Sequence, residues 1–445
     1  MVILSDGEMI TVHKFGGSCL RDSSDLERIS QVIKQTSGQS IIVVSALWGT
    51  TDRLLRASHE PRYAGRLVHD LEEQHLRFSP GLAESNIGHL FSNVLNGIEK
   101  SLVELAVNPK NNVAKNRLLA AGERLSALVV SHFLNTMGMS THPVGAEDIG
   151  LRLNGKGKAP TVDLESSRKN LNLSALQGTP ILTGWFGQGT DGELALLGRG
   201  GSDHTATAIA NLVDANKVIL WKDVAGVLPI NPRWGIETTA INYLGYGEAM
   251  ELSRLDTPVL HPATVEPLAA VGIPLEIMHL YQEREFSQTI IGPDIHDEYN
   301  IKGIGCLTSV AYLSIETLSL EEQSKNFGQL LVDLATEGIT CWHIHSQPGE
   351  VKIIISQYEI IQAIQIISKH FQTPKVDTYD AMISLVGNGT EDEQLMLFEQ
   401  LGNRLGLELL SQSPHSVRLL AKEININSLL VELSELFNLC NTLHQ

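Results

Sequence analysis

The chain has 445 residues, of which 42% are hydrophobic and 19% are charged, and its formal net charge at pH 7 is -18. This length exceeds that of one ordinary hydrophobic core, so we expect two or three domains. The acidic balance argues against binding to nucleic acid or to a membrane surface, which would need a basic footprint. A small anionic substrate would therefore need a local basic pocket within an acidic surface.

The cysteines indicate a reducing compartment, because they are widely spaced and form no C-x-x-C pair. They are Cys19, Cys306, Cys341 and Cys440. Asp6 and Glu8 interrupt the apolar residues near the N-terminus, so we expect no signal peptide, and no apolar stretch is long enough to span a membrane. We therefore expect a cytoplasmic protein without a zinc site or a disulfide framework.

The first expected strand, residues 9–15, runs directly into Gly16, Gly17 and Ser18. Lys14 thus lies at the carboxyl end of a strand, beside a glycine turn. In an open α/β sheet, ligands bind at that edge. Lys14 is therefore either a ligand-binding cation or an ordinary surface lysine at a strand end.

A second expected strand, residues 40–44, ends in a hydroxyl-rich segment that contains Ser45 and Thr51. Such side chains either hydrogen-bond a polar ligand or cap a helix. Residues 61–134 show the long amphipathic periods of helices, with Glu123 between apolar turns. Glu123 is either a solvated helix residue or a buried contact for a ligand amine.

A glycine-rich segment, residues 197–208, leads into a predicted helix that begins near Ser202. Its three glycines allow positive φ and close approach to a ligand, and the free N–H groups of the helix can hold an anion. The spacing matches neither the Walker pattern nor the dinucleotide fingerprint. The segment is either a phosphate cradle or an ordinary turn in which Ser202 or Asp203 caps the helix.

A further strand, residues 217–221, ends in Lys222 and Asp223. Asp223 could face a base, a ribose or a metal, and an Asn-Pro-Arg turn supplies Arg233 as another cation. Strands alternate with helices, and polar residues gather at the strand ends. This pattern predicts an α/β sandwich with a mostly parallel sheet over residues 1–294.

Residues 295–300 form a polar linker, after which the order of the predicted strands and helices changes. Residues 301–375 and 376–445 each show the order β-α-β-β-α, which predicts two ferredoxin-like units of similar length. Small sheets of this kind usually pair their edges, so we expect a homodimer or a larger homo-oligomer. His343 and His345 alternate on a predicted strand, and we interpret them as solvent-side residues rather than metal ligands.

Taken together, these segments resemble the aspartokinase branch of the amino-acid kinase family over nearly the whole chain. The two C-terminal units look like the regulatory ACT pair of that branch. The motifs that carry the resemblance are Lys14-Phe-Gly-Gly-Ser18, Val43-Val-Ser45-Ala with Thr51, Gly122-Glu123, Gly198-Arg-Gly-Gly-Ser-Asp203, Asp223-Val-Ala-Gly226, Asn231-Pro-Arg233 and Val259-Leu-His-Pro262.

The resemblance implies phosphorylation of the β-carboxylate of L-aspartate by ATP and Mg²⁺. The product would be 4-phospho-L-aspartate, for the synthesis of lysine, threonine and methionine. A carboxylate is already ionised at neutral pH, so the reaction needs alignment and charge neutralisation rather than a general base. The resemblance also implies feedback control by an amino acid bound at the ACT pair.

The family pattern assigns roles to individual residues of this chain. Lys14 would stabilise the transferring phosphoryl group, and Asp203 would orient Lys14 and the reacting groups. The residues expected to bind aspartate are Ser45, Thr51, Glu123, Arg199, Gly200, Gly201 and Ser202. The residues expected to bind ATP are Lys14, Gly16, Gly17, Ser18, Lys222, Asp223 and Arg233. No residue is assigned as a dedicated metal ligand.

The chain departs from the pattern at Pro258, where many members have a lysine that contacts the ATP phosphates. Lys222, at a normally neutral position, could supply the missing charge-assisted contact. The alternatives are a catalytically weak amino-acid sensor and a kinase for another small carboxylate. Intact Lys14, Arg199 and Asp203 favour an active enzyme over a sensor.

Overall fold

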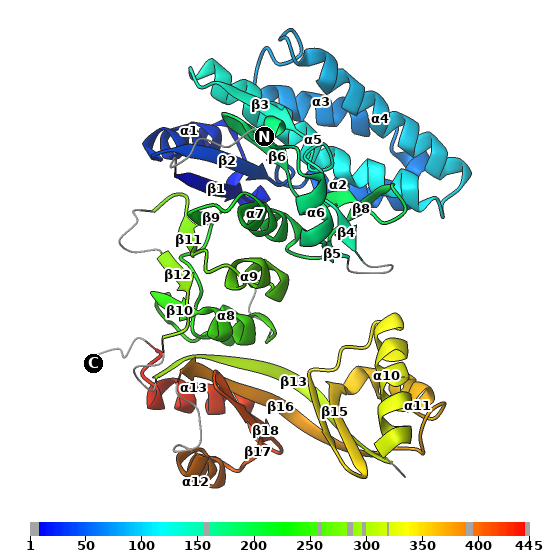
Figure 1. The fold of residues 1–445 in the computed structure, drawn as a ribbon, viewed down its shortest axis with the longest axis vertical. Helices are drawn as coiled ribbons and strands as arrows, with labels where there is room; N and C mark the ends of the chain where they lie inside the picture. Colours follow the sequence, from blue (N-terminus) through cyan, green and yellow to red (C-terminus); the bar gives the residue numbers. More distant parts are fainter. Residues whose placement is uncertain are drawn as a thin grey trace. The chain divides into compact units, whose positions relative to one another are not determined.

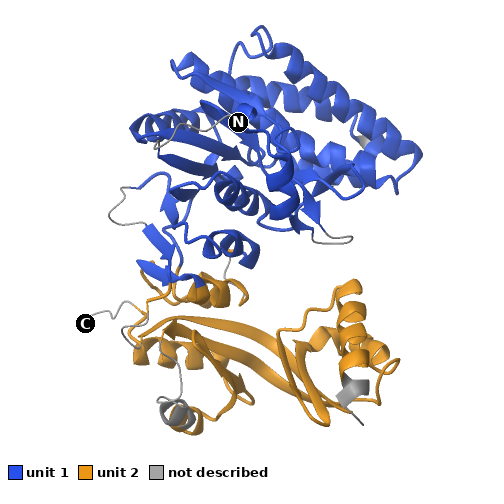
Figure 2. Cartoon of the chain, viewed as in Figure 1, with its two compact units in different colours: residues 1–227, 242–246, 261–293 blue, residues 228–241, 247–260, 294–445 orange. Residues whose placement is uncertain are grey.

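The computed structural model describes residues 9–154, 160–255, 260–282, 288–295, 300–317, 320–388 and 395–440. The chain divides into two units, which Figure 2 shows in different colours. Unit 1 comprises residues 1–227, 242–246 and 261–293, and unit 2 comprises residues 228–241, 247–260 and 294–445. Two segments of the expected first domain, 228–241 and 247–260, therefore group with the C-terminal part of the chain.

Unit 1 contains an eight-stranded sheet in which every described pair except β11–β12 is parallel (Figure 1). The mostly parallel α/β sheet expected from the sequence is confirmed. The strands, in sheet order, are β10 (Tyr243–Gly245), β12 (Gln288–Gly292), β11 (Leu275–His279), β9 (Lys217–Lys222), β1 (Ile10–Phe15), β2 (Gln39–Val44), β6 (Thr179–Thr183) and β3 (Thr141–Val144). All six residues of β1 are buried. Both faces of the sheet are therefore covered, as is usual for parallel strands.

Helices provide that cover, because α7 packs on β1, β2 and β9 while α5 packs on β2, β3 and β6. The helices of unit 1 are α1 (Ser23–Gln35), α2 (Thr50–His59), α3 (Leu67–Phe78), α4 (Gly88–Val107), α5 (Asn112–Thr136), α6 (Leu164–Asn170), α7 (Gly201–Leu212) and α9 (Pro262–Ala269). Two short antiparallel pairs, β4 (Leu153–Asn154) with β5 (Thr161–Val162) and β7 (Phe186–Gln188) with β8 (Leu194–Leu196), complete the unit.

Unit 2 contains a six-stranded antiparallel sheet with the order β14-β15-β13-β16-β18-β17. In chain order its elements are β13 (Asn300–Glu316), α10 (Leu320–Thr336), β14 (His343–Gln347), β15 (Glu350–Ser356), α11 (Ile360–Ile367), β16 (Lys375–Asn388), α12 (Leu395–Leu405), β17 (Leu407–Ser413), β18 (Ser416–Ala421) and α13 (Ile426–Leu436). The predicted order β-α-β-β-α thus occurs twice. From Gly247 on, α8 (Tyr246–Ser253) also belongs to unit 2.

The two repeats of unit 2 share one sheet, because β13 and β16 pair with each other from Asn300↔Asn388 to Ser314↔Lys375. Both strands extend well beyond their apolar stretches at 310–315 and 381–386. The additional residues include Gly303, Gly305 and several charged side chains, which have low strand propensity. Their extended conformation comes from pairing with the other repeat.

His343 and His345 lie on the edge strand β14, half-buried and exposed respectively. Among the described residues, no three His, Cys, Asp or Glu side chains are grouped so that they could hold a metal ion. No helix in the described ranges is both long enough and apolar enough to cross a membrane.

Candidate active site

Three charged side chains meet at the carboxyl edge of the parallel sheet in unit 1. Lys14 Nζ lies 2.6 Å from Asp203 Oδ1, and Lys222 Nζ lies 2.6 Å from Asp203 Oδ2. Lys14 is on β1 and Lys222 ends the adjacent parallel strand β9, while Asp203 lies in the first turn of α7. The structure therefore joins three of the predicted site residues, which are far apart in the sequence.

Burial controls the charges of this cluster. Burial lowers the pKa of Lys14, and the Asp203 carboxylate opposes that effect. Burial alone would raise the pKa of Asp203, but the two ammonium groups outweigh it and hold the pKa well below its usual range. With both lysines charged, the cluster carries one excess positive charge beside the N-terminus of α7, which also favours anions.

The glycines after β1 allow the chain to pass close to these groups. A Cβ atom on Gly16 would lie 3.2 Å from Lys14 Nζ, and one on Gly17 would lie 3.1 Å from the carbonyl oxygen of Ala46. Ser18 follows in the same short 3₁₀ turn, Gly17–Cys19. Any larger residue at Gly16 would crowd the lysine ammonium group, so this turn is shaped around it.

The glycines before α7 are required by its backbone. Gly200 is the N-cap residue with φ +73, which favours glycine. A Cβ atom on Gly201 would lie 2.6 Å from Leu197 Cβ, and one on Gly184 would lie 2.6 Å from Ser202 Cβ. The predicted glycine turn therefore does open a helix at the sheet edge.

Arg199, directly before this turn, is exposed, and its side chain has no hydrogen bond or ion pair within the described ranges. Its guanidinium group is therefore available to an anionic ligand. Ser45 lies at the end of β2, half-buried, and its N–H donates to Phe15 O at 3.1 Å.

Glu123 is 3% exposed on α5, and its Oε1 accepts a hydrogen bond from Ala46 N at 3.3 Å. Its Oε2 is buried and has no hydrogen-bond partner among the described residues. Burial raises the pKa of Glu123 to about 8, although the Ala46 N–H and the Lys14 charge act in the opposite direction. Of the two alternatives for Glu123, the buried position is the one observed.

Two positions at this edge were not singled out from the sequence. Thr50 is fully buried at the start of α2, and its hydroxyl has no partner in the described part of the chain, whereas the predicted Thr51 is half-buried. Trp185 follows Gly184 with a φ of 71°, a strained value for a bulky residue, and its N–H donates to Thr205 Oγ1 at 3.1 Å. The glycine-bounded turn after β6 was the available signal for Trp185.

Asp223 and Arg233, which were also predicted to contact ATP, each have a partner within the chain. The Asp223 carboxylate pairs with Arg21 at 2.7 Å, so part of its charge is already balanced. Arg233 belongs to unit 2, where its guanidinium donates to Cys306 O at 3.4 Å. Pro258 lies outside the described residues. The structure thus groups Lys14, Asp203 and Lys222 within unit 1, whereas Arg233 is part of unit 2.

Comparison with known proteins identifies the family of this chain. The model of the amino acid kinase family matches residues 9–279. The chain belongs to that family.

The relatives found by sequence are aspartokinases. The chain is 25% identical over 455 residues to the bifunctional aspartokinase/homoserine dehydrogenase of Buchnera aphidicola, covering 93% of this chain and 54% of that protein. It is 25% identical over 413 residues to aspartokinase 1, chloroplastic, of Arabidopsis thaliana, covering 85% of this chain and 70% of that protein. The chain thus spans about half the length of the Buchnera protein.

Among solved structures, the chain resembles E. coli aspartokinase III in complex with aspartate and ADP (R-state), with a TM-score of 0.76 and 20% identity. The match covers 96% of this chain and 99% of that chain. The T-state of the same enzyme, in complex with lysine and aspartate, matches with a TM-score of 0.71. These likenesses establish the shared fold.

Proposed function

We propose that this protein is an aspartate kinase, which transfers the γ-phosphoryl group of ATP to the β-carboxylate of L-aspartate. The observation that carries the proposal is the cluster of Lys14, Asp203 and Lys222, in which two ammonium groups share one carboxylate at a ligand-binding sheet edge. The names of the sequence relatives support aspartate as the substrate. The ligands of E. coli aspartokinase III support both aspartate and a nucleotide.

Aspartate would bind through groups whose bonding capacity is unused. The Arg199 guanidinium is free to form a forked contact with a substrate carboxylate. Glu123 Oε2 is a buried acceptor without a partner in the described residues, and a substrate α-ammonium group would satisfy it. Ser45, Thr51 and the turn at 200–202 would supply the remaining polar contacts, and Thr50 is an additional candidate.

In the proposed reaction, a β-carboxylate oxygen of aspartate attacks the γ-phosphorus of ATP. A P–O bond forms, the bond between the γ-phosphorus and the β,γ-bridging oxygen breaks, and ADP leaves with the electron pair. No proton must be removed from the nucleophile. Lys14 and Lys222 would neutralise charge on the transferring group, while Asp203 holds both ammonium groups in place.

Mg²⁺ fits this site as a companion of the nucleotide rather than as a resident ion. The described residues contain no cluster of three acidic, His or Cys side chains for it. Mg²⁺ usually binds through substrate phosphates and one or two carboxylates. Asp223, which directly follows Lys222 in the sequence, is the carboxylate that would hold it, and Mg²⁺ would add further positive charge at the phosphates.

Lys222 is proposed to replace the family lysine that is absent at Pro258. Its Nζ shares the Asp203 carboxylate with Lys14, so the two ammonium groups face one region. Substitution of Lys222 by methionine should raise the KM for ATP by about tenfold, the size of one lost charge-assisted contact. An unchanged KM for ATP would remove this part of the proposal.

A coupled assay of ADP release with Mg-ATP tests the activity. L-Aspartate, L-glutamate and N-acetyl-L-glutamate are supplied separately, and we expect turnover with aspartate alone. Turnover with one of the other acids would identify a kinase for a different carboxylate. Aspartate binding without ADP release would identify the amino-acid sensor that the substitution at Pro258 leaves open.

The two repeats of unit 2 are proposed to bind an amino-acid effector and to mediate self-association in the cytoplasm. β14 and β17 are the edge strands of the described six-stranded sheet, and a sheet of this kind can extend by pairing an edge strand with a second chain. Sedimentation velocity tests self-association. The ADP-release assay with and without lysine, threonine or methionine tests effector binding. A monomer whose kcat and aspartate KM respond to none of the three would contradict both proposals.

A further inference from the structure

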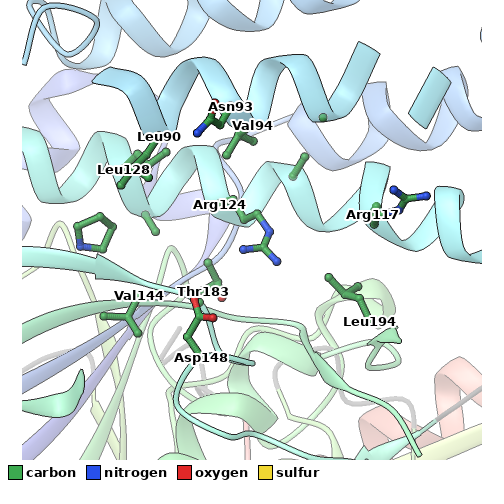
Figure 3. Close-up of a pocket in the computed structure, with 15 residues that line it drawn as sticks. Leu90, Asn93, Val94, Arg117, Arg124, Leu128, Val144, Asp148, Thr183 and Leu194 are labelled. Carbon is green, nitrogen blue, oxygen red and sulfur yellow. The ribbon is translucent and has the colours of Figure 1, made fainter. Parts of the chain in front are cut away.

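Apart from the charge cluster, a cavity lies in unit 1 between helices α4 and α5 and the carboxyl ends of β3 and β6 (Figure 3). Its volume is about 380 Å³, within the range of small-molecule pockets. Leu90 and Val94 of α4, Leu128 of α5 and Val144 of β3 form an apolar lining. The reaction proposed above uses none of these residues.

Two groups of opposite charge also line this cavity. Figure 3 shows the Arg124 guanidinium extending from α5 toward the strand ends, where Asp148 lies. Arg124 pairs with Glu147, and its guanidinium carbon lies 5.0 Å from the Phe186 ring centroid, so its side chain is held in place. Other guanidinium donors stay open to a ligand.

Asp148 is exposed, and its carboxylate has no hydrogen bond or ion pair within the described part of the chain. It therefore does not pair with Arg124, although both line the same space. Its neighbour Glu147 pairs with Arg124 and is not among the residues that line the cavity, so Asp148 is the acidic side chain that faces this space.

We propose that this cavity binds a free amino acid with an apolar side chain. Its carboxylate would contact Arg124, and its ammonium group would contact Asp148. Its side chain would pack on Leu90 and Leu128. A zwitterion with an apolar side chain meets all three requirements, since the cavity offers one cationic group, one anionic group and a lining that is mostly apolar.

This site is distinct from the proposed aspartate site, although both use α5. Glu123 bonds to Ala46 N at the end of β2, whereas its neighbour Arg124, with Ala121 and Leu128, lines the cavity. One continuous helix thus carries residues of both sites. Occupancy of the cavity would act on the position of Glu123 through α5.

Isothermal titration calorimetry of the full-length protein with L-leucine, L-methionine and L-phenylalanine tests the site without requiring turnover. It therefore stays informative if the proposed kinase activity fails. We expect at least one of the three to bind the unaltered protein. Absence of binding by all three would overturn the proposal.

Two variants locate the binding, each with a matched control. Asp148→Asn removes one charged contact and should weaken binding by about tenfold or more, while Asp214→Asn, at another exposed aspartate, should not. Gly97 lies on α4 at the cavity, and a Cβ atom there meets nothing within 4 Å. Gly97→Leu should therefore fill the cavity without disturbing the helix.

Gly328→Leu is the control for Gly97→Leu, because Gly328 is also helical and a Cβ atom there meets nothing within 4 Å. Replacement of glycine by leucine favours the helix in both cases, so loss of folding is not expected. Loss of binding in Gly97→Leu and Asp148→Asn alone supports the proposal. Unchanged binding in both of these variants would place the ligand elsewhere and refute it.

Discussion

In unit 1, β1, β2, β6 and β9 run parallel and all end at one edge of the sheet, whereas the strands of unit 2 run antiparallel and end alternately at opposite edges. Residues that follow the strands of unit 1 therefore gather in one place, and the buried charges lie there. In unit 2, equivalent residues are divided between two edges. Strand direction alone thus explains why the candidate chemistry lies in unit 1.

The buried charges of the two units also differ in balance. In unit 1, Asp203 is shared by Lys14 and Lys222. In unit 2, Glu248, only 2% exposed, pairs with Lys302 at 2.6 Å, which balances one charge with one opposite charge. Excess charge at a buried site needs a ligand or a counter-ion, whereas a balanced pair holds structure. Substitutions in the two units test whether these buried charges have different roles.

The largest effect is expected for Lys14→Met. Because this variant removes a buried cation from the proposed phosphoryl site, kcat for ADP release should fall about 10²- to 10³-fold. Lys169→Met, at an exposed lysine on α6, is the control and should leave kcat unchanged. An unaltered kcat in Lys14→Met would show that the charge cluster serves structure alone.

Asp203→Asn should lower the free energy of unfolding by about 3–5 kcal/mol, because the buried Lys14 and the half-buried Lys222 lose their shared carboxylate. Urea denaturation measures this loss. The anion site predicts in addition that Mg-ATP raises the melting temperature of this variant more than that of the unaltered protein. An equal or smaller rise would contradict the anion site.

Lys302→Met should lower the free energy of unfolding by less, about 1–3 kcal/mol, because the buried Glu248 carboxylate loses its ion pair with Lys302. Mg-ATP should stabilise this variant no more than it stabilises the unaltered protein. An additional stabilisation by Mg-ATP, as large as that of Asp203→Asn, would erase the proposed difference between the units.

The smallest effect concerns Glu123, whose pKa burial raises to about 8. At pH 6 this group is mostly protonated in the free protein, and it must lose the proton to accept the substrate ammonium as a carboxylate. The KM for aspartate should therefore fall on the order of tenfold between pH 6 and pH 8. The same measurement on Glu123→Gln should give a flat profile.

The stability of the free protein provides the control for this assignment. A carboxyl group with a raised folded-state pKa stabilises the protein below its unfolded value of 4.5, and the contribution is lost as pH rises to about 8. Glu123→Gln should show a smaller decrease of stability across that window. Identical slopes in the two proteins would mean that Glu123 is ionised throughout.

The sequence was sufficient to predict the sheet edge in unit 1. Lys14 and Lys222 each follow a short apolar run, and the rule that parallel strands end together places them side by side. The turn before α7 could be predicted from its glycines, because few residues other than glycine adopt the positive φ that Gly200 has. The repeat in unit 2 could be predicted from the order of its expected strands and helices.

Features that depend on packing between distant segments could not be predicted in this way. The raised pKa of Glu123 results from burial against the end of β2, and no local pattern encodes that burial. Helix α9 begins at Pro262, a residue that singly does not distinguish a helix start from a helix end, although proline is well suited to a first helical position. The grouping of 247–260 with unit 2 depends on ion pairs such as Glu248–Lys302.

The long pairing of β13 with β16 has a consequence for any attempt to isolate half of unit 2. Cutting the chain between the repeats and keeping one of them would strip a long strand of its neighbour and leave a continuous row of unsatisfied amide and carbonyl groups. Such an edge recruits other chains. A single excised repeat should therefore precipitate or form fibrils, whereas the intact tandem should unfold as one cooperative block.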